Sequence, residues 1–360
     1  MRRAATGLLA AAVLAAGCRT EKRLVEFGWD EPDTAFLRRH IREMEKTPFD
    51  GCVFHASYGP PGAQRSLAWK TWGRQAFTPR DVASSIADLQ ATDLGRFREM
   101  FLRVNVTPGD VDWFDDFTPV LGNLRLAAEI AQKGGARGLL FDTEAYEGPV
   151  WDVRRQPQSD RHTGDEYAAQ ARRRGREAMA AIQAGFPRAK VMLTFGYELP
   201  WRESEGGRRP LAECRYGLLA PFLDGLVDGA RGARLVDGYE RSYGFKEPRE
   251  FWDGYDVMRR RVRPLVADPG KYHRVSTVGF GLWLDYDGHV RGWDEVAYAN
   301  NHFTPEAFER ALRAALETTD EYVWIYAERI RWWTEEGGAA HLPAAYEAAL
   351  RRAAGERSRR

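Results

Sequence analysis

The 360-residue chain has few cysteines, few histidines and almost no net charge, and each shortage excludes a class of site. Its three cysteines and seven histidines do not recur at the spacing of a metal-binding motif. Its 53 basic and 52 acidic side chains give a formal net charge of +1, which provides no broad positive surface for nucleic acid. We therefore expect no metal, no other cofactor and no nucleic-acid partner. Cys52 and Cys214 are expected as buried free thiols, with a disulfide between them as the alternative.

Apolar runs long enough to span a membrane are absent as well, but the first 17 residues, MRRAATGLLAAAVLAAG, contain a shorter one. Two arginines, the apolar stretch and small residues before Cys18 give this segment the layout of a secretory signal. The stretch LAAGC resembles the lipobox of bacterial lipoproteins, although Leu14 lies four residues before Cys18 instead of three. The resemblance implies removal of residues 1–17, lipidation of Cys18 and a short tether over 18–23. It also implies an anchor in the bacterial cell envelope, on the periplasmic or outer-membrane face, whereas ordinary secretion after cleavage near Ala16 is the alternative.

Apolar runs rich in β-branched residues alternate with amphipathic stretches over residues 24–353. Eight strand–helix units in one uninterrupted series predict a single (β/α)₈ barrel with long loops after its strands, followed by a basic disordered tail over 354–360. A doubly wound open sheet is the competitor, but Gly28 is followed by WDEPD where its glycine-rich phosphate loop would stand. The expected strands are 24–29, 51–56, 99–106, 137–144, 190–198, 234–240, 273–283 and 321–328. The expected helices lie near 34–46, 80–94, 118–133, 165–185, 210–228, 248–267, 304–318 and 342–353.

Aromatic side chains are plentiful, with 12 Trp, 14 Tyr and 18 Phe, and many of them follow the expected strands together with carboxylates. Barrel enzymes carry their active sites at the carboxyl ends of the strands, so these side chains would meet at one rim. The candidate substrate-binding residues selected in this way are Trp29, Asp30, His55, Asn105, Tyr146, Tyr197, Glu198, Trp283, Asp285 and Glu328.

The expected fourth strand runs directly into two carboxylates, as GLLFDTEAY over residues 138–146. Asp142 and Glu144 lie on the same side of an extended strand, so an inward-facing Asp142 would carry Glu144 to the mouth of the barrel. Two carboxylates held close together raise the proton affinity of one and favour ionisation of the other. Such a pair supplies the general acid and the base or nucleophile that glycosidic bond cleavage requires.

Architecture and the Asp142–Thr143–Glu144 motif together resemble (β/α)₈ glycoside hydrolases, over about residues 24–350. The motif is similar to the end of the fourth-strand motif of chitinase-like barrels, but Gly138 and Leu140 stand where those enzymes carry further aspartates. The resemblance implies a carbohydrate substrate and a glycoside hydrolase, without implying chitinase activity. Two alternatives stay open: a carbohydrate-binding lipoprotein that has lost catalysis, and a lyase or hydrolase of another class.

The second carboxylate of the pair has several candidates. Glu240 is favoured, because DGYE ends the sixth expected strand and some barrel enzymes draw their pair from strands four and six. Others use strands four and seven, which would select Asp285. Glu198 and Glu328 also remain. The candidate catalytic residues are therefore Glu144, Asp142 and Glu240.

Three long loops carry tryptophans and are expected to cover the substrate. Segment 56–80 contains Trp69 and Trp72 and exceeds the usual length of a plain connection. Segments 145–163 and 284–303 follow the fourth and seventh expected strands.

Overall fold

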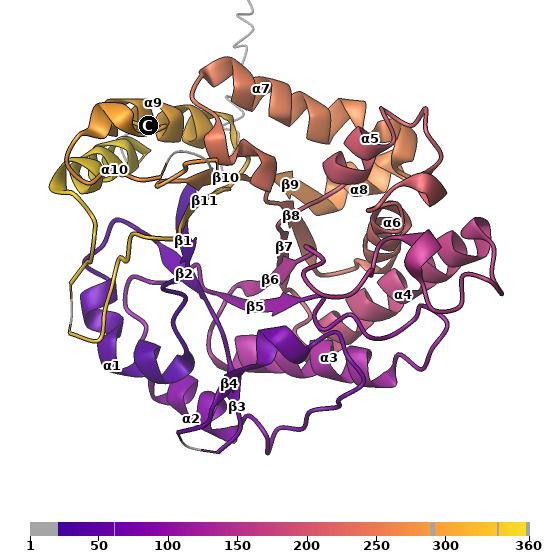
Figure 1. Ribbon diagram of the computed structural model, residues 1–360. Coiled ribbons are helices and arrows are strands. Elements are labelled where there is room, and N and C mark those ends of the chain that lie inside the picture. Colours follow the sequence, from indigo (N-terminus) through magenta and orange to yellow (C-terminus); the bar gives the residue numbers. More distant parts are fainter. Residues whose placement is uncertain (1–20, 61, 289–291, 337, 358–360) are drawn as a thin grey trace, which may run out of the picture.

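The computed structural model describes residues 21–60, 62–288, 292–336 and 338–357. Its main sheet has nine strands in the order β10-β11-β1-β2-β5-β6-β7-β8-β9, and every neighbouring pair is parallel. Helices surround the ring of strands (Figure 1). The predicted (β/α)₈ barrel is therefore confirmed. Cys18, the expected signal and most of the tether lie outside the described residues.

The strands are short, as usual for a barrel, and all but β10 begin within a few residues of a predicted start. Their bounds are β1 (Arg23–Gly28), β2 (Gly51–Phe54), β5 (Phe101–Asn105), β6 (Gly138–Asp142), β7 (Lys190–Leu193), β8 (Arg234–Asp237), β9 (Ser276–Val278), β10 (Phe280–Trp283) and β11 (Tyr322–Ala327).

The helices follow the strands in sequence and pack outside them. They are α1 (Thr34–Met44), α2 (Ala83–Ala91), α3 (Thr118–Lys133), α4 (Gly164–Gly185), α5 (Glu198–Glu203), α6 (Leu219–Gly229), α7 (Pro248–Asp256), α8 (Pro269–Val275), α9 (Pro305–Thr318) and α10 (Ala344–Arg357). Local capping explains several starts: the Asp33 side chain accepts the N–H of Phe36, and Thr163 with Glu166 forms a capping box. Helix α10 runs through Arg357, into the segment expected as a tail.

A bend in the chain between β9 and β10 brings the two ends of the sheet together. The two ends of the sheet, β9 and β10, are consecutive in the chain and are joined at Gly279, whose N–H donates to the Asp237 carbonyl at 2.7 Å. A Cβ at Gly279 would lie 3.1 Å from the Tyr322 carbonyl oxygen, which explains why glycine suits the seam. The expected seventh strand over 273–283 is thus two short strands, and its first residues are helical because α8 continues through Val275.

Alternate residues of the strands fill the barrel. The interior cluster consists of Val25, Phe27, Val53, Phe101, Leu140, Met192, Val236, Tyr322 and Trp324. Two residues further along their strands, the same inward face carries Arg103, Asp142 and Tyr326, which line a cavity. The apolar layer is therefore the floor under a polar rim.

Several predicted strands end earlier than expected, and this moves their acidic residues: β6 ends at Asp142, so Glu144 lies just beyond the strand. Strand β7 ends at Leu193, so Glu198 opens α5 instead of ending a strand. Strand β8 ends at Asp237, and Glu240 opens a short 3₁₀ helix, Glu240–Gly244.

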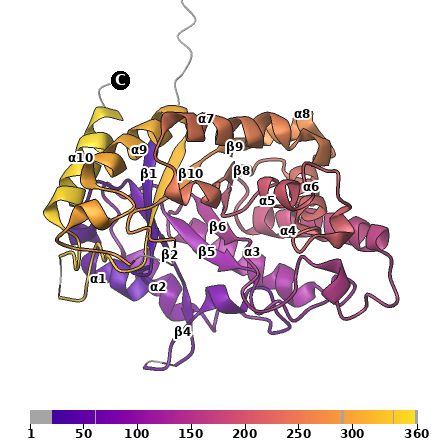
Figure 2. The ribbon, with the colours of Figure 1, turned by 45° about the horizontal axis from the view of Figure 1, so that its top comes forward.

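Segment 56–80, of which the structure describes all residues but 61, packs on the barrel. It forms an antiparallel hairpin of β3 (Ser57–Tyr58) and β4 (Arg65–Ser66), which projects beyond the surrounding helices (Figure 2), and a 3₁₀ helix, Leu67–Lys70. Trp69 is partly exposed beside the cavity, whereas Trp72 is buried in the core. Cys52 and Cys214 are separate buried thiols. Within the described ranges, no helix combines the length and apolar character needed to cross a bilayer.

Candidate active site

A cavity of about 700 Å³ opens at the carboxyl ends of the barrel strands. It is lined by eight of the residues selected from the sequence: Trp29, His55, Asp142, Glu144, Tyr146, Glu240, Trp283 and Glu328. It is also lined by residues that were not selected as candidates: Phe27, Gly28, Glu31, Ser66, Trp69, Arg103, Thr194, Tyr243 and Tyr326.

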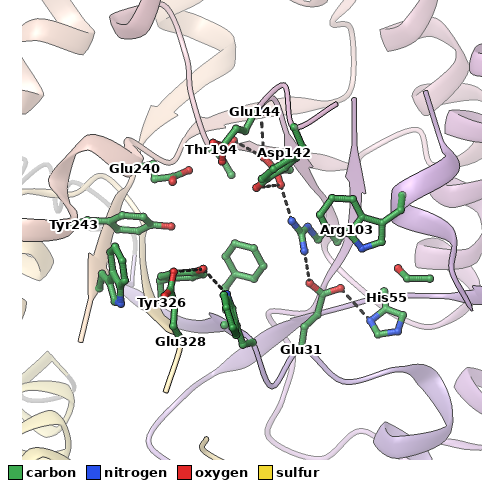
Figure 3. Close-up of a pocket in the computed structure, with 17 residues that line it drawn as sticks. Glu31, His55, Arg103, Asp142, Glu144, Thr194, Glu240, Tyr243, Tyr326 and Glu328 are labelled. Atoms are coloured by element: carbon green, nitrogen blue, oxygen red, sulfur yellow. Dashed lines mark hydrogen bonds and ion pairs between the residues drawn. The ribbon is translucent and has the colours of Figure 1, made fainter. Parts of the chain in front are cut away.

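Arg103 links two carboxylates across one side of the cavity (Figure 3). Its Nη1 donates to Glu31 at 3.0 Å and its Nη2 donates to Asp142 at 2.7 Å. His55 Nδ1 lies 3.1 Å from the other oxygen of Glu31. Burial raises the pKa of Glu31, but Arg103 and His55 outweigh burial, so this pKa lies below its ordinary value.

Asp142 is an acceptor with several donors. Besides Arg103, it accepts the Tyr146 hydroxyl at 3.0 Å, the Thr194 hydroxyl at 3.2 Å and the Glu144 backbone N–H at 3.1 Å. A carboxylate bound this way holds its neighbours in place and has little freedom to react. The contacts of Asp142 are those of a residue that positions its neighbours.

Glu144 and Glu240 both have raised pKa values. For Glu144 burial contributes most, followed by the charge of Asp142, while the Tyr146 hydroxyl and two arginines act in the opposite direction. For Glu240 burial again contributes most, followed by Asp142 and Glu144, so its pKa lies well above the ordinary value. The cavity therefore contains two carboxyl groups that hold protons above the usual pH.

A strained turn places Glu240 in the cavity. The preceding residue, Tyr239, has φ 45° and ψ 63°, a left-handed conformation that bulky residues rarely adopt. The Glu240 N–H then donates to the Thr194 carbonyl at 3.1 Å, at the end of the adjacent strand. In Figure 3, Glu240 and Tyr243 lie across the cavity from Arg103.

Aromatic rings form the wall beside Glu240. Tyr243 and Tyr326 stack with centroids 5.2 Å apart and planes 17° from parallel, and Trp283 packs on both. The Tyr326 hydroxyl donates to Glu328 at 3.2 Å and accepts from Trp29 Nε1 at 2.8 Å. Three exposed rings, those of Trp29, Trp69 and Tyr146, lie at the mouth.

Three other predicted substrate-binding residues do not line the cavity, and each has hydrogen-bond partners elsewhere. Asp285 accepts the Trp283 Nε1–H at 2.6 Å and the backbone N–H groups of residues 328–330. Asp30 accepts the Trp332 N–H at 2.5 Å, and Asn105 accepts the Thr107 N–H at 3.0 Å.

The fifth-strand candidates also turn away from the cavity, since β7 ends before them. The Tyr197 hydroxyl donates to Asp224 at 2.7 Å, and the buried Glu198 pairs with Arg202 on its own helix. Of the alternatives to Glu240 as partner of Glu144, Glu198 and Asp285 therefore do not line the cavity, whereas Glu328 does.

Of the lining residues missed by sequence reasoning, some had a signal in the strand pattern and others had none. Arg103 lies on the same face of its strand as Phe101 and Asn105. The two-residue period of EMFLRVNV therefore indicates that this arginine faces inward. Tyr326 likewise shares a strand face with Tyr322 and Trp324. Tyr243 lies in a 3₁₀ helix, where no strand periodicity indicates its direction.

No group of three or more histidine, cysteine or acidic side chains among the described residues has the arrangement of a metal site. The side chains at the cavity could instead bind a neutral or cationic organic molecule, through rings and carboxyl groups.

Comparisons with known proteins concern the fold. The chain is similar to a psychrophilic glycoside hydrolase family 10 endo-β-1,4-xylanase, with 10% identity, a TM-score of 0.46 and coverage of 92% of this chain and 96% of that one. It is similar to endonuclease IV from Thermus thermophilus, with 11% identity, a TM-score of 0.43 and coverage of 93% and 99%. It is similar to β-mannanase from the blue mussel Mytilus edulis, with 10% identity, a TM-score of 0.41 and coverage of 94% and 92%. No protein-family model and no curated protein sequence matches the chain.

Proposed function

We propose that this protein is a glycoside hydrolase-like enzyme that cleaves glycosidic bonds with Glu144 and Glu240. The observation that carries the proposal is that these two carboxyl groups, both with raised pKa values, face one cavity with aromatic walls. The charge of Glu144 raises the pKa of Glu240, so over an interval of pH the pair holds one proton and supplies an acid and a base together.

The proposed roles follow from the surroundings of each group. Glu240 has the more strongly raised pKa and holds the proton, which passes to the leaving oxygen as the glycosidic C–O bond breaks. Glu144 acts as base or nucleophile at the anomeric carbon, and a water molecule completes the hydrolysis. Asp142 positions Glu144 through its backbone N–H and holds Tyr146 in place.

The aromatic wall supports a sugar as the substrate. The C–H face of a pyranose ring packs well on flat apolar surfaces, and Tyr243, Tyr326 and Trp283 form such a surface. The exposed rings of Trp29, Trp69 and Tyr146 would bind further units of a longer chain at the mouth.

The test is hydrolysis of a broad panel of oligosaccharides and polysaccharides by the chain from Arg19 onward. We expect E144Q and E240Q each to lower kcat/KM by about 10²–10⁴-fold, the usual loss for a general acid or base. The matched control is E147Q, since Glu147 lies in the same loop as Glu144 and does not line this cavity. Unchanged product release in both cavity variants would contradict the proposal, and glycan binding without any product would favour a carbohydrate-binding protein.

Leaving-group dependence tests the roles. A good aryl leaving group needs no proton, so E240Q should keep most of its activity on a dinitrophenyl glycoside, whereas E144Q should lose activity on every substrate. The reverse pattern would exchange the two roles.

We also propose export to the cell envelope and lipidation at Cys18, which rests on the lipobox-like stretch LAAGC. Metabolic labelling with palmitate tests this: the full chain should be labelled and sediment with membranes, and C18S should be unlabelled. Labelling of C18S would contradict the anchor.

A further inference from the structure

The cavity has an excess of carboxylates. Its described lining residues include five carboxyl groups, those of Glu31, Asp142, Glu144, Glu240 and Glu328, and a single guanidinium, that of Arg103, with His55 beside Glu31. Even when Glu144 and Glu240 share one proton, the acidic groups outnumber the arginine. A neutral sugar entering the cavity would remove water from these charges without replacing its hydrogen bonds fully.

The arginine is already committed to protein carboxylates. Its two terminal nitrogens donate to Glu31 and Asp142, and the rings of Phe27 and Trp69 lie 5.2 and 5.0 Å from its guanidinium carbon. The fork that would bind the carboxylate or sulfate of an acidic sugar is therefore occupied. An anionic substrate would meet Glu144 and Glu240, and the described lining residues offer it no second arginine and no lysine as a counter-charge.

The opposite side of the cavity suits a cation. Glu240 lies next to the stacked rings of Tyr243 and Tyr326, whose centroids are 5.2 Å apart, and the cation that lowers its pKa, Arg103, is bound to other carboxylates. The face of an aromatic ring carries partial negative charge and attracts an ammonium group. Carboxylate and ring faces together form a partly buried site. A positive charge bound there would compensate the carboxylate for the water that it loses.

We propose that the cavity binds an amino sugar with a free ammonium group, placed between the Glu144–Glu240 pair, which carries a negative charge when it shares one proton, and the Tyr243–Tyr326 wall. This inference rests on the proposed function only for the sugar, since the charge preference follows from the cavity itself. N-acetylation would remove the positive charge, and a uronic acid would reverse it. The substrate class is therefore a glycan with deacetylated amino-sugar units.

Monosaccharides test the preference without turnover, because they contain no glycosidic bond to cleave. Glucosamine, galactosamine and mannosamine are each compared with the parent sugar and the N-acetyl sugar, and glucuronic acid is added as the anion. The full chain in detergent is titrated, and binding is followed by tryptophan fluorescence, since Trp29, Trp69 and Trp283 line the cavity.

We expect at least one amino sugar to bind about tenfold more tightly than its neutral and N-acetyl partners, and glucuronic acid to bind most weakly. The preference should shrink as ionic strength rises. In E144Q, which replaces the charged member of the pair, the amino sugar should lose about tenfold in affinity while its neutral partner changes little, and E147Q should behave like the unmodified protein.

Equal binding of amino and neutral sugars, an undiminished amino-sugar preference in E144Q, or no binding of any amino sugar would overturn the proposal. The result is independent of catalysis: amino-sugar preference without hydrolysis of any glycan would leave this inference standing and contradict the proposed enzyme. Hydrolysis of neutral glycans without amino-sugar preference would do the opposite.

Discussion

Arg103 and Asp142 form an ion pair of 2.7 Å between neighbouring strands of the barrel, and both side chains line the cavity. The pair is nearly buried, with side-chain exposures of 12% and 1%. Glu144 and Tyr146 both donate hydrogen bonds to Asp142, and Glu31 accepts one from Arg103, so the pair connects all three residues. The geometry of the cavity therefore depends on this contact.

Removing the arginine should destabilise the protein strongly. In R103A the buried Glu31 and Asp142 lose their shared cation, and leaving a buried charge unpaired typically costs about 3–5 kcal/mol. Urea unfolding measures the loss. The matched control is R125A, which removes an exposed helical ion pair with Glu129 and should change the free energy of unfolding by about 0.5 kcal/mol or less. Equal effects of both variants would show that the Arg103 network does not stabilise the fold.

Glu240 should make the protein less stable as the pH rises. Its pKa in the folded state is raised, mainly by burial and then by Asp142 and Glu144, above the ordinary value of 4.5. A group of this kind gives its full stabilisation below the unfolded pKa and loses it as the pH rises through the folded pKa. E240Q should therefore gain stability relative to the unmodified protein as the pH rises from the ordinary glutamate pKa of 4.5 towards neutrality. Urea midpoints of both proteins at several pH values measure this, and a difference that is constant with pH would contradict it.

Tyr243 should tune the proton affinity of Glu240. As a hydrogen-bond donor near Glu240, its hydroxyl lowers the pKa of that carboxyl, against the larger effect of burial. Y243F removes the donor, so the pKa of Glu240 should rise. If Glu240 is the general acid, the alkaline limb of the pH–rate profile should move to higher pH. The control is Y255F, since Tyr255 bonds Asp320 away from the cavity. A shift to lower pH, or the same shift in Y255F, would contradict this role.

Gly279 should be sensitive to a single added methyl group. A Cβ there would lie 3.1 Å from the Tyr322 carbonyl oxygen and 3.2 Å from a Val236 methyl, at the bend that closes the barrel. We expect G279A to lower the free energy of unfolding by about 1–3 kcal/mol. G122A is the control: Gly122 lies within α3 with nothing within 4 Å of a new Cβ, so alanine there should stabilise by about 0.5–1 kcal/mol. If G279A leaves the free energy of unfolding unchanged or raises it, the bend tolerates the added methyl group and this prediction is wrong.

The sequence by itself determined the barrel and the position of its acidic strand end. Strand and helix periods are local properties, so the sequence alone predicts the alternation of eight strand–helix units. It also predicts that Leu140, Asp142 and Glu144 point to the same side. Only the tertiary structure decided which charges meet. Arg103 contacts Glu31 and Asp142 from 72 and 39 residues away, through strand register and the closure of the sheet at Gly279. The early ends of β7 and β8 likewise directed Glu198 into a helix and Glu240 into the cavity. Such pairings follow from packing between distant strands, and no local pattern in the chain encodes them.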